Sequence, residues 1–344
     1  MSARRDRALT NDSFGPIALG AAPLGNLYAR VGDEDAIGVV RRAYRAGVRY
    51  FDTAPHYGNG LSEHRVGSAL RDVARGDYLL SSKVGRLLIA DDGAPRDQNG
   101  YVGVLPFVQR YDYTGDGTRR SIEDSLQRLG VSRLDIVYIH DIDRDTHGEA
   151  FAPRFRDAME GAVPALARLK RDGAIGGYGL GVNDWRVCMD ALAHADLDFI
   201  LLAGRYTLLD QSALPELLPE SERRGVKIVL GGPYNSGILA TGAHPPRGAP
   251  AYFNYAPASA AIVAKVERIE AVCAAHAVPL RAAALQFPRA HPAVATVLVG
   301  ARSAAEIDEN VALANAPIPA DFWRALKSEG LLPDGAPLPG GSRA

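Results

Sequence analysis

The segment FDTAPHYGNGLSEHRVGSAL, residues 51–70, places an acid and a tyrosine close together where an apolar run ends. Asp52 is the last residue of VRYFD, and Tyr57 follows it five residues later. Two other apolar runs also end in an ionisable side chain, YLLSSK at Lys83 and LDIVYIH at His140. Burial of such a group without a partner is costly, so we expect these side chains to lie at a polar mouth or beside one another.

These side chains suggest proton transfer at a carbonyl or hydroxyl group. A tyrosine hydroxyl titrates at about pH 10, and a nearby Lys83 ammonium is expected to lower the pKa of Tyr57. Asp52 would hold Lys83 charged and in place. Tyr57 is then the candidate general acid/base, and His140 hydrogen-bonds or orients the substrate. No side chain supplies a hydride, so this chemistry implies a nicotinamide cofactor.

Alternating short apolar runs and longer amphipathic segments would position these residues. Eight runs are predicted to be strands, at 17–20, 48–52, 78–83, 134–140, 176–182, 198–203, 226–231 and 296–300. Helical patterns occur at 33–47, 61–73, 118–130, 161–173, 185–195, 214–225, 258–277 and 279–290. The alternation predicts a closed (β/α)8 TIM barrel, favoured over an open doubly wound sheet. Active sites of such barrels lie where the strands end, which is where Asp52, Lys83 and His140 fall.

The composition indicates a globular chain, expected to form a single barrel domain over residues 1–344. Hydrophobic residues make up 47% of the chain and the formal net charge is −1, which gives no electrostatic case for nucleic acid or a membrane surface. Residues 1–13 are basic but lack the apolar core of a secretory signal, so we expect a cytoplasmic protein with a small-molecule partner. Cys188 and Cys273 are predicted to be buried thiols.

Two other motifs and three single residues are expected to have structural roles. HDIDRDTHGE, residues 140–149, alternates carboxylates with histidines but lacks the spacing of a calcium loop, so we interpret it as a solvated acidic loop and expect no metal. The glycines of GGYGLG, residues 176–181, fall inside a strand and do not form a dinucleotide fingerprint. Ser62 is predicted to cap a helix, while His56 and His64 are assigned to loop packing and a helix face.

A long loop is predicted at about residues 85–117, and we expect it to cover the substrate. Several aromatic residues in and around it are candidate sugar-stacking faces or hydroxyl partners, namely Tyr101, Phe107, Tyr111, Tyr113, Tyr28 and Trp185. Of these, Tyr28 and Trp185, together with His140, are the predicted substrate-binding residues.

The chain resembles the aldo-keto reductases over about residues 14 to 330. FDTAPHYGNGLSEHRVGSAL is similar to that family's signature around its aspartate and tyrosine, SIEDSLQRLGVSRLDIVYIH to its second signature, and GARSAAEIDEN to its cofactor-binding end. The resemblance implies that Tyr57 is the general acid/base and that Asp52, Lys83 and His140 complete the catalytic tetrad. The YDYTGDG turn, residues 111–117, particularly resembles the bacterial aldose dehydrogenases within the family.

The resemblance also implies a set of cofactor-binding residues. Asn183 matches the ligand of the nicotinamide carboxamide. The remaining candidates follow the seventh and eighth strands and are Gly231, Gly232, Pro233, Ser236, Gly237, Gly300, Arg302, Glu306, Glu309 and Asn310. Two positions depart from many members, since Ala203 stands in place of a glutamine and Gly231 in place of a stacking tyrosine.

NAD is the expected cofactor. NADP-preferring members carry a lysine and an arginine where this chain has Gly300 and Glu306, so both cations for a 2′-phosphate are missing. A carboxylate repels that phosphate but accepts hydrogen bonds from ribose hydroxyls. Arg302 leaves a route to some use of NADP, and the alternative role for Glu306 is to open the next helix.

The expected reaction is oxidation of L-fucose or a related D-threo-aldose at its anomeric carbon to the lactone. Pyridoxal 4-dehydrogenase or general aldehyde and ketone reductase activity are alternatives within the family. Two alternatives from other classes are a metal-dependent hydrolase or isomerase using His140, Asp141 and Asp143, and a poorly catalytic redox-sensing interaction protein. The sequence shows no exposed apolar heptad pattern from which an oligomeric state could be predicted.

Overall fold

The computed structural model describes residues 9, 13–246 and 249–340. The prediction that the basic segment 1–13 is not a secretory signal therefore concerns residues that lie almost entirely outside the described part. Within the described ranges, no helix combines the length and apolar character needed to span a bilayer.

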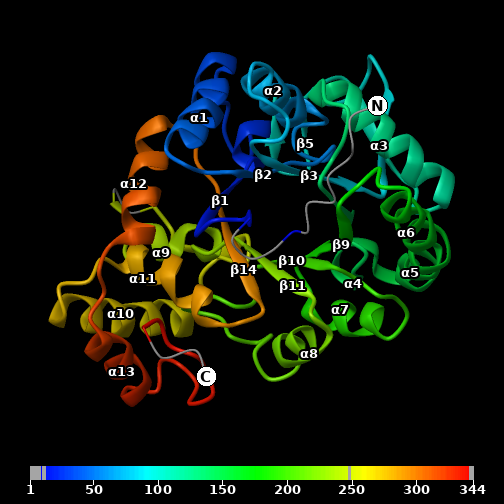
Figure 1. The fold of residues 1–344 in the computed structure, drawn as a ribbon. Coiled ribbons are helices and arrows are strands. Elements are labelled where there is room, and N and C mark those ends of the chain that lie inside the picture. Colours follow the sequence, from blue (N-terminus) through cyan, green and yellow to red (C-terminus); the bar gives the residue numbers. More distant parts are fainter. Residues whose placement is uncertain (1–8, 10–12, 247–248, 341–344) are drawn as a thin grey trace.

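Eight parallel strands close into a barrel in the order β1-β14-β11-β10-β9-β8-β3-β2 (Figure 1). They are β1 (Ile17–Gly20), β2 (Tyr50–Asp52), β3 (Leu79–Val84), β8 (Ile136–His140), β9 (Gly177–Val182), β10 (Phe199–Ala203), β11 (Lys227–Gly231) and β14 (Val294–Val299). Each predicted strand is present, with its ends within two residues of the predicted ones. The predicted (β/α)8 barrel is confirmed.

Helices surround the barrel and cover the outer faces of its strands (Figure 1). The longer ones are α1 (Asp33–Arg45), α2 (Leu61–Leu70), α3 (Gly115–Leu129), α6 (Val163–Arg171), α7 (Trp185–Leu192), α8 (Leu217–Arg224), α10 (Ala260–Ala275), α12 (Ala304–Asn315) and α13 (Ala320–Ser328). Shorter helices are α4 (Arg144–His147), α5 (Phe151–Asp157), α9 (Ile238–Thr241) and α11 (Leu280–Gln286). Glycines end two of them, because Gly130 and Gly225 adopt the left-handed conformation after α3 and α8.

The segment at residues 85–117, predicted to be a long loop that covers the substrate, is a folded insertion with strands of its own. It forms an antiparallel hairpin of β4 (Arg86–Ala90) and β7 (Phe107–Tyr111), and between them lies a smaller pair, β5 (Asp97–Gln98) and β6 (Tyr101–Val102). Its last residues, 115–117, belong to α3. Glycines and prolines separate these short strands, so the alternation within each is too brief to stand out in the sequence.

Alternating side chains on each strand face two cores. The larger core lies between the barrel and the helices and includes Phe51, Leu80 and Val137. The smaller core fills the barrel with Phe14, Ala18, Tyr50, Leu79, Ile136, Tyr138, Phe199, Leu201, Val229 and Leu298. Side chains alternate along a strand, so Asp52, Lys83 and His140 share the inward face with Tyr50, Leu79 and Tyr138. The barrel interior therefore ends in an ionisable layer at the carboxyl ends of the strands.

The glycines of β9 make room for this interior. Gly177, Gly179 and Gly181 alternate along the strand, and a β-carbon at Gly179 would lie 1.6 Å from the carbonyl oxygen of Phe199 on β10. At Gly181 a β-carbon would contact the aliphatic chain of Lys83 at 3.4 Å. The GGYGLG pattern is thus explained by packing of the barrel interior.

Replacement of Gly179 by alanine should destabilise the barrel, because the new methyl group meets backbone and cannot be accommodated by a side-chain rotation. We expect Gly179→Ala to lower the free energy of unfolding by about 3 kcal/mol or more. Gly38→Ala on α1 is the matched control, since its β-carbon meets nothing within 4 Å, and it should raise stability by about 0.5–1 kcal/mol. Equal denaturant midpoints for the two variants would contradict this reading.

Candidate active site

A buried ion pair between β2 and β3 forms the floor of the site. The ammonium Nζ of Lys83 donates to Oδ2 of Asp52 at 2.6 Å and to the carbonyl oxygen of Thr53 at 2.9 Å. The hydroxyl of Ser81 donates to the other carboxylate oxygen at 2.6 Å. Lys83 and Asp52 are both only 2% exposed. Because β2 and β3 pair with Asp52 opposite Ser81, the strand register itself brings the two charges together.

Tyr57 lies in the turn after β2, beside this ion pair. Lys83 Nζ is 4.7 Å from the centre of the Tyr57 ring. The turn is held by a close backbone approach from the segment after β1, since a β-carbon at Gly25 would lie 2.5 Å from the Tyr57 carbonyl carbon. Ser62 does not cap the following helix as predicted: Gly60 occupies the N-cap, and the buried Ser62 hydroxyl donates to the carbonyl oxygen of Ala21 at 2.8 Å.

The electrostatics of Tyr57 differ from the sequence-based expectation. Burial raises the pKa of the Tyr57 hydroxyl well above its usual value, and the negative charge of Asp52 adds to that effect. The expected lowering by Lys83 is not found, because the lysine ammonium is committed to Asp52 and the Thr53 carbonyl. At neutral pH the tyrosine is therefore a neutral phenol, ready to donate a proton.

His140 ends β8 and faces Tyr57 across the mouth of the barrel, with ring centres 6.0 Å apart. Burial lowers the pKa of His140 well below its usual value, and Arg86 and Lys83 lower it further. The imidazole is therefore neutral at physiological pH. The hydroxyl of Tyr113, in the segment after β7, donates to the His140 carbonyl oxygen at 2.7 Å and anchors the end of the strand.

A second ion pair, missed by the sequence analysis, lies beside His140. Arg86 Nη2 of β4 donates to Oδ2 of Asp141 at 2.5 Å, and that oxygen is 3.5 Å from His140 Nε2. Asp141 has a φ of 49°, uncommon for a residue other than glycine. Its side chain is only 16% exposed, so its assignment to a solvated acidic loop is wrong. The signal was its position immediately after a strand that ends in His140.

Among the described residues, no group of three or more histidine, cysteine or acidic side chains is arranged to hold a metal ion. The carboxylates after β8 have other partners. Asp141 binds Arg86, and Asp143 caps α4 by accepting from the Thr146 amide at 2.8 Å. Cys188 and Cys273 are buried free thiols, as predicted.

A cavity of about 360 Å³ opens over these groups. Tyr57, Lys83 and His140 line it together with His56, Asp141, Asn183, Leu201 and Ala203, and three tyrosines, Tyr28, Tyr101 and Tyr255, lie around it. The folded insertion contributes Asn99, Gly100 and Tyr101. His56 and Tyr255 are lining residues that the sequence analysis did not assign to the site.

Tyr255 reaches the cavity from a short hairpin between β11 and α10, made of β12 (Tyr252–Phe253) and β13 (Ala256–Pro257). Asn254 and Tyr255 form its turn with φ angles of 48° and 63°. The Tyr255 amide donates to the Ser236 hydroxyl at 2.9 Å, so the hairpin joins the cavity to a predicted cofactor segment.

The two remaining predicted substrate residues lie in different places. Tyr28 lines the cavity and is 57% exposed. Trp185 is buried at the start of α7 and lines a neighbouring hollow of about 320 Å³ with Asp184, Arg205 and Asp210. Of the residues that the structure describes, only Asn183 lines both hollows. The structure therefore does not bring Trp185 together with Tyr57 and His140.

The predicted cofactor segments lie side by side because β11 and β14 are paired. Gly231 ends β11, and the turn after it has positive φ angles at Gly232, Ser236 and Gly237. Gly300 follows β14, where a β-carbon would lie 2.9 Å from Pro23. Exposed backbone in left-handed turns beside a helix start suits the phosphates of a dinucleotide, so these residues fit the implied cofactor.

Several side chains of the second segment are occupied by protein contacts. Ser303 caps α12 by accepting from the Glu306 amide at 3.2 Å, and Glu306 accepts from the Arg302 amide at 2.9 Å. These two contacts at the start of α12 support the alternative role of Glu306 as a residue that opens the helix. Glu309 is paired with Arg281, and Asn310 accepts from the Tyr234 hydroxyl at 2.7 Å.

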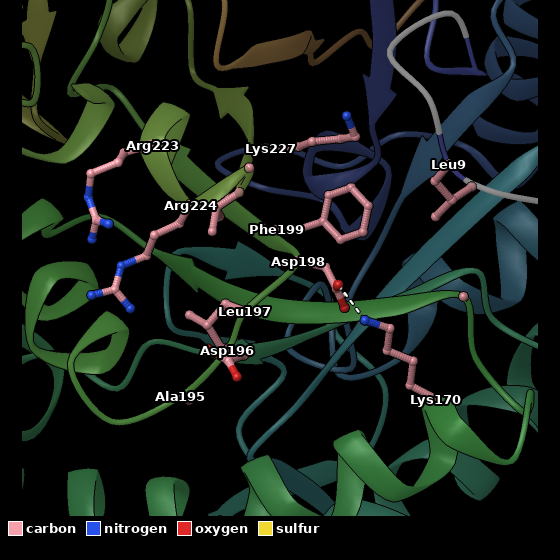
Figure 2. A pocket seen from close by; sticks show the side chains of 13 residues that line it. Leu9, Lys170, Ala195, Asp196, Leu197, Asp198, Phe199, Arg223, Arg224 and Lys227 are labelled. Atoms are coloured by element: carbon pink, nitrogen blue, oxygen red, sulfur yellow. Dashed lines mark hydrogen bonds and ion pairs between the residues drawn. The ribbon is translucent and has the colours of Figure 1, made fainter. Parts of the chain in front are cut away.

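A larger hollow of about 660 Å³ lies at the opposite end of the barrel (Figure 2). Phe199 and Lys227, which line it, are the first residues of β10 and β11. Figure 2 shows Lys170 paired with Asp198, whose Nζ to Oδ1 distance is 2.5 Å. No member of the ionisable layer lines this hollow, so size alone does not mark the site.

Removal of Lys83 should destabilise the protein, because Asp52 would then be a buried carboxylate without a counter-ion. We expect Lys83→Met to lower the free energy of unfolding by about 3–5 kcal/mol at about pH 8, because a carboxylate is left without its counter-ion. Burial raises the pKa of Asp52, so the carboxyl of the variant takes up a proton as the pH falls, and the loss should shrink at about pH 5.

Denaturant unfolding at both pH values measures this effect. The double variant Asp52→Asn/Lys83→Met is the control, since it buries no charge and should recover most of the lost stability. A loss in Lys83→Met that is the same at both pH values, or that persists in the double variant, would rule out an uncompensated Asp52 as its cause.

Comparison with known proteins agrees with this geometry. A model of the Aldo/keto reductase family matches residues 16–329. Pyridoxal 4-dehydrogenase of Microbacterium luteolum is 42% identical over 344 residues, covering 96% of this chain and 99% of that protein. D-threo-aldose 1-dehydrogenase of a Pseudomonas species is 37% identical over 322 residues, covering 92% and 94%. A solved aldo-keto reductase of Bacillus halodurans, in its holo form, has a TM-score of 0.70 at 25% identity over 95% of both chains. The chain belongs to the aldo/keto reductase family.

Proposed function

We propose that the chain oxidises the anomeric carbon of L-fucose or a related D-threo-aldose to the lactone, with NAD as the preferred cofactor. The observation that carries the proposal is that Tyr57, Lys83 and His140 line one cavity, where Asp52 is paired with Lys83 and the wall also presents the Asp141 carboxylate. The 37% identity to a D-threo-aldose 1-dehydrogenase supports the substrate class.

The proposed reaction needs one proton acceptor from the protein. In a cyclic aldose the anomeric hydroxyl belongs to a hemiacetal. Loss of its proton and of the hydride on C1 converts the C–O bond to the carbonyl of a lactone, a two-electron oxidation without ring opening. The bound nicotinamide supplies the hydride acceptor. The deprotonated form of Tyr57 takes the hydroxyl proton and becomes the neutral phenol, and the neutral His140 imidazole orients the same oxygen.

The wall of the cavity suits a substrate with several hydroxyl groups. Asp141 offers carboxylate oxygens; burial raises the pKa of this carboxyl, and the positive charge of its partner Arg86 acts in the opposite direction and favours the carboxylate. Tyr28, Tyr101 and Tyr255 offer flat faces with hydroxyl groups around the cavity. A sugar ring presents both apolar C–H faces and hydroxyl edges, and this combination of aromatic and charged groups recognises both.

Pyridoxal is the second candidate substrate, and the 42% identity to a pyridoxal 4-dehydrogenase is the observation that favours it. Pyridoxal carries a hydroxymethyl group beside its aldehyde, so it also closes to a hemiacetal that oxidation converts to a lactone. Tyr57 would have the same role. A panel of aldoses, pyridoxal and simple aldehydes, assayed with NAD and NADP, decides between these substrates. No turnover of any of them would favour the redox-sensing interaction protein.

Tyr57→Phe tests the proton-transfer role. We expect turnover to fall by at least about a hundredfold, with cofactor affinity nearly unchanged, because the ring remains but the hydroxyl is lost. In the wild type, oxidation should accelerate as the pH rises from neutral, since burial raises the pKa of Tyr57 and the deprotonated fraction grows with pH. Steady-state rates measure the turnover and its pH dependence, and fluorescence titrations measure the cofactor affinity. Near-normal turnover of Tyr57→Phe would remove Tyr57 from this role.

Glu306→Gln tests the cofactor preference and separates the two roles of this residue. The glutamine oxygen can still accept from the Arg302 amide, so helix α12 and the thermal midpoint should be preserved. If the charge excludes a 2′-phosphate, the ratio of kcat/KM for NADP over NAD should rise by about tenfold, equivalent to about 1.4 kcal/mol. An unchanged ratio would leave Glu306 as a helix cap only, and a wild type more efficient with NADP would overturn the preference for NAD.

A further inference from the structure

His56 occupies the wall of the cavity next to Tyr57 and His140. Its ring centre is 6.1 Å from that of Tyr57 and 5.6 Å from that of His140. Its Nδ1 lies 3.0 Å from Oε1 of Gln109, on strand β7 of the folded insertion. Its Nε2 has no hydrogen-bond partner among the described residues. It is nevertheless not one of the buried nitrogen and oxygen atoms that lack both a partner and accessible surface. That nitrogen is therefore open to the cavity.

The hydrogen bonds behind His56 have a fixed direction. The Asn59 amide nitrogen donates to the carbonyl oxygen of Phe107 at 2.6 Å, and a carbonyl can only accept. The Asn59 side-chain oxygen must then be the acceptor for Gln109 Nε2, at 2.7 Å. This orients Gln109 so that its oxygen faces His56.

Arg86 confirms the orientation from the other side. Its Nη1 is 3.1 Å from the same Gln109 oxygen, and a guanidinium can only donate. Because the atom of Gln109 that faces His56 is the oxygen Oε1, which can only accept, His56 Nδ1 must carry the proton. In a neutral imidazole the opposite nitrogen, Nε2, is then a bare acceptor.

The surroundings keep this imidazole neutral. Burial lowers the pKa of His56 to about 3, and the positive charges of Arg86 and Lys83 act in the same direction. Asp141, the carboxylate that lines the same cavity, is paired with Arg86. Nε2 therefore stays an acceptor across the pH range in which the enzyme would work.

We propose that His56 is a specificity-determining residue whose Nε2 accepts a hydrogen bond from a substrate hydroxyl beside the reacting carbon, an assignment that rests on the reaction proposed above. His56 and Tyr57 line the same cavity with ring centres 6.1 Å apart, so we assign to His56 a hydroxyl on a carbon next to the one oxidised. Gln109 and Asn59 are positioning residues that set the tautomer. The site would thus prefer 2-hydroxy carbonyl compounds and their hemiacetals over compounds without that hydroxyl.

The preference is tested by a matched pair of aldehydes, lactaldehyde and propanal, reduced with NADH or NADPH. His56→Phe should lower kcat/KM for lactaldehyde by about tenfold, the scale of one hydrogen bond, and that for propanal by less than about threefold. His56→Gln, whose amide oxygen can accept, should retain part of the preference. His64→Phe is the control, because His64 is exposed on α2 outside the cavity. Equal losses on both aldehydes in His56→Phe would overturn the proposal.

The tautomer is tested without turnover by nitrogen NMR of histidine-labelled protein. The His56 signals, assigned by their absence from His56→Gln, should show a protonated Nδ1 and a bare Nε2 from about pH 5 to pH 8. Gln109→Leu should abolish this bias. A protonated Nε2 in the wild type would overturn the proposal. Failure to oxidise any aldose would instead refute the proposed function, because neither of these two experiments uses an aldose.

Discussion

The ion pair of Asp52 and Lys83 is the constraint on which the mouth of the barrel depends. Two charges that are each 2% exposed are tolerable only if every polar atom has a partner. Asp52 receives Lys83 on one oxygen and Ser81 on the other, and the remaining lysine contact is the Thr53 carbonyl. Those contacts require β2 and β3 to be parallel and in register, which ties the site to the closure of the sheet.

The same carboxylate terminates a chain of hydroxyl groups that runs down the barrel. Ser81 uses its only proton on Asp52, so the Tyr50 hydroxyl, 2.9 Å away, must donate to Ser81. Tyr138 in turn donates to Tyr50 at 2.9 Å. All of these dipoles point toward Asp52, which offsets part of the cost of burying its charge. Burial still raises the pKa of Asp52, so Lys83 is needed to keep it ionised.

The sequence predicted the barrel and its ionisable layer because both follow from local patterns. Asp52, Lys83 and His140 each end an apolar run, and the carboxyl ends of parallel strands meet at one face of a barrel. Their positions at the strand ends were therefore enough to predict that they lie close together. The missing parts depend on contacts distant in sequence. Asp141 looked solvated because its partner, Arg86, lies 55 residues away in a hairpin whose strands are short. Likewise, the direction of hydrogen bonding at His56 depends on Asn59 and Gln109, 50 residues apart.

The barrel and the insertion contribute residues with different chemical roles. The eight-stranded barrel supplies Tyr57, Lys83, Asp52 and His140, which suit proton transfer at any carbonyl. The insertion between β3 and α3 supplies Arg86, Gln109 and Tyr101, none of which is placed to move that proton. Arg86 joins both halves, because one guanidinium nitrogen holds the Asp141 carboxylate and another fixes the Gln109 oxygen behind His56. Burial lowers the pKa of both His56 and His140, and the positive charge of Arg86 adds to that effect. A single arginine on β4 therefore helps to position both the Asp141 carboxylate and the His56 imidazole on the cavity wall. Substitutions in the insertion can then change substrate choice while the Asp52–Lys83 ion pair stays intact.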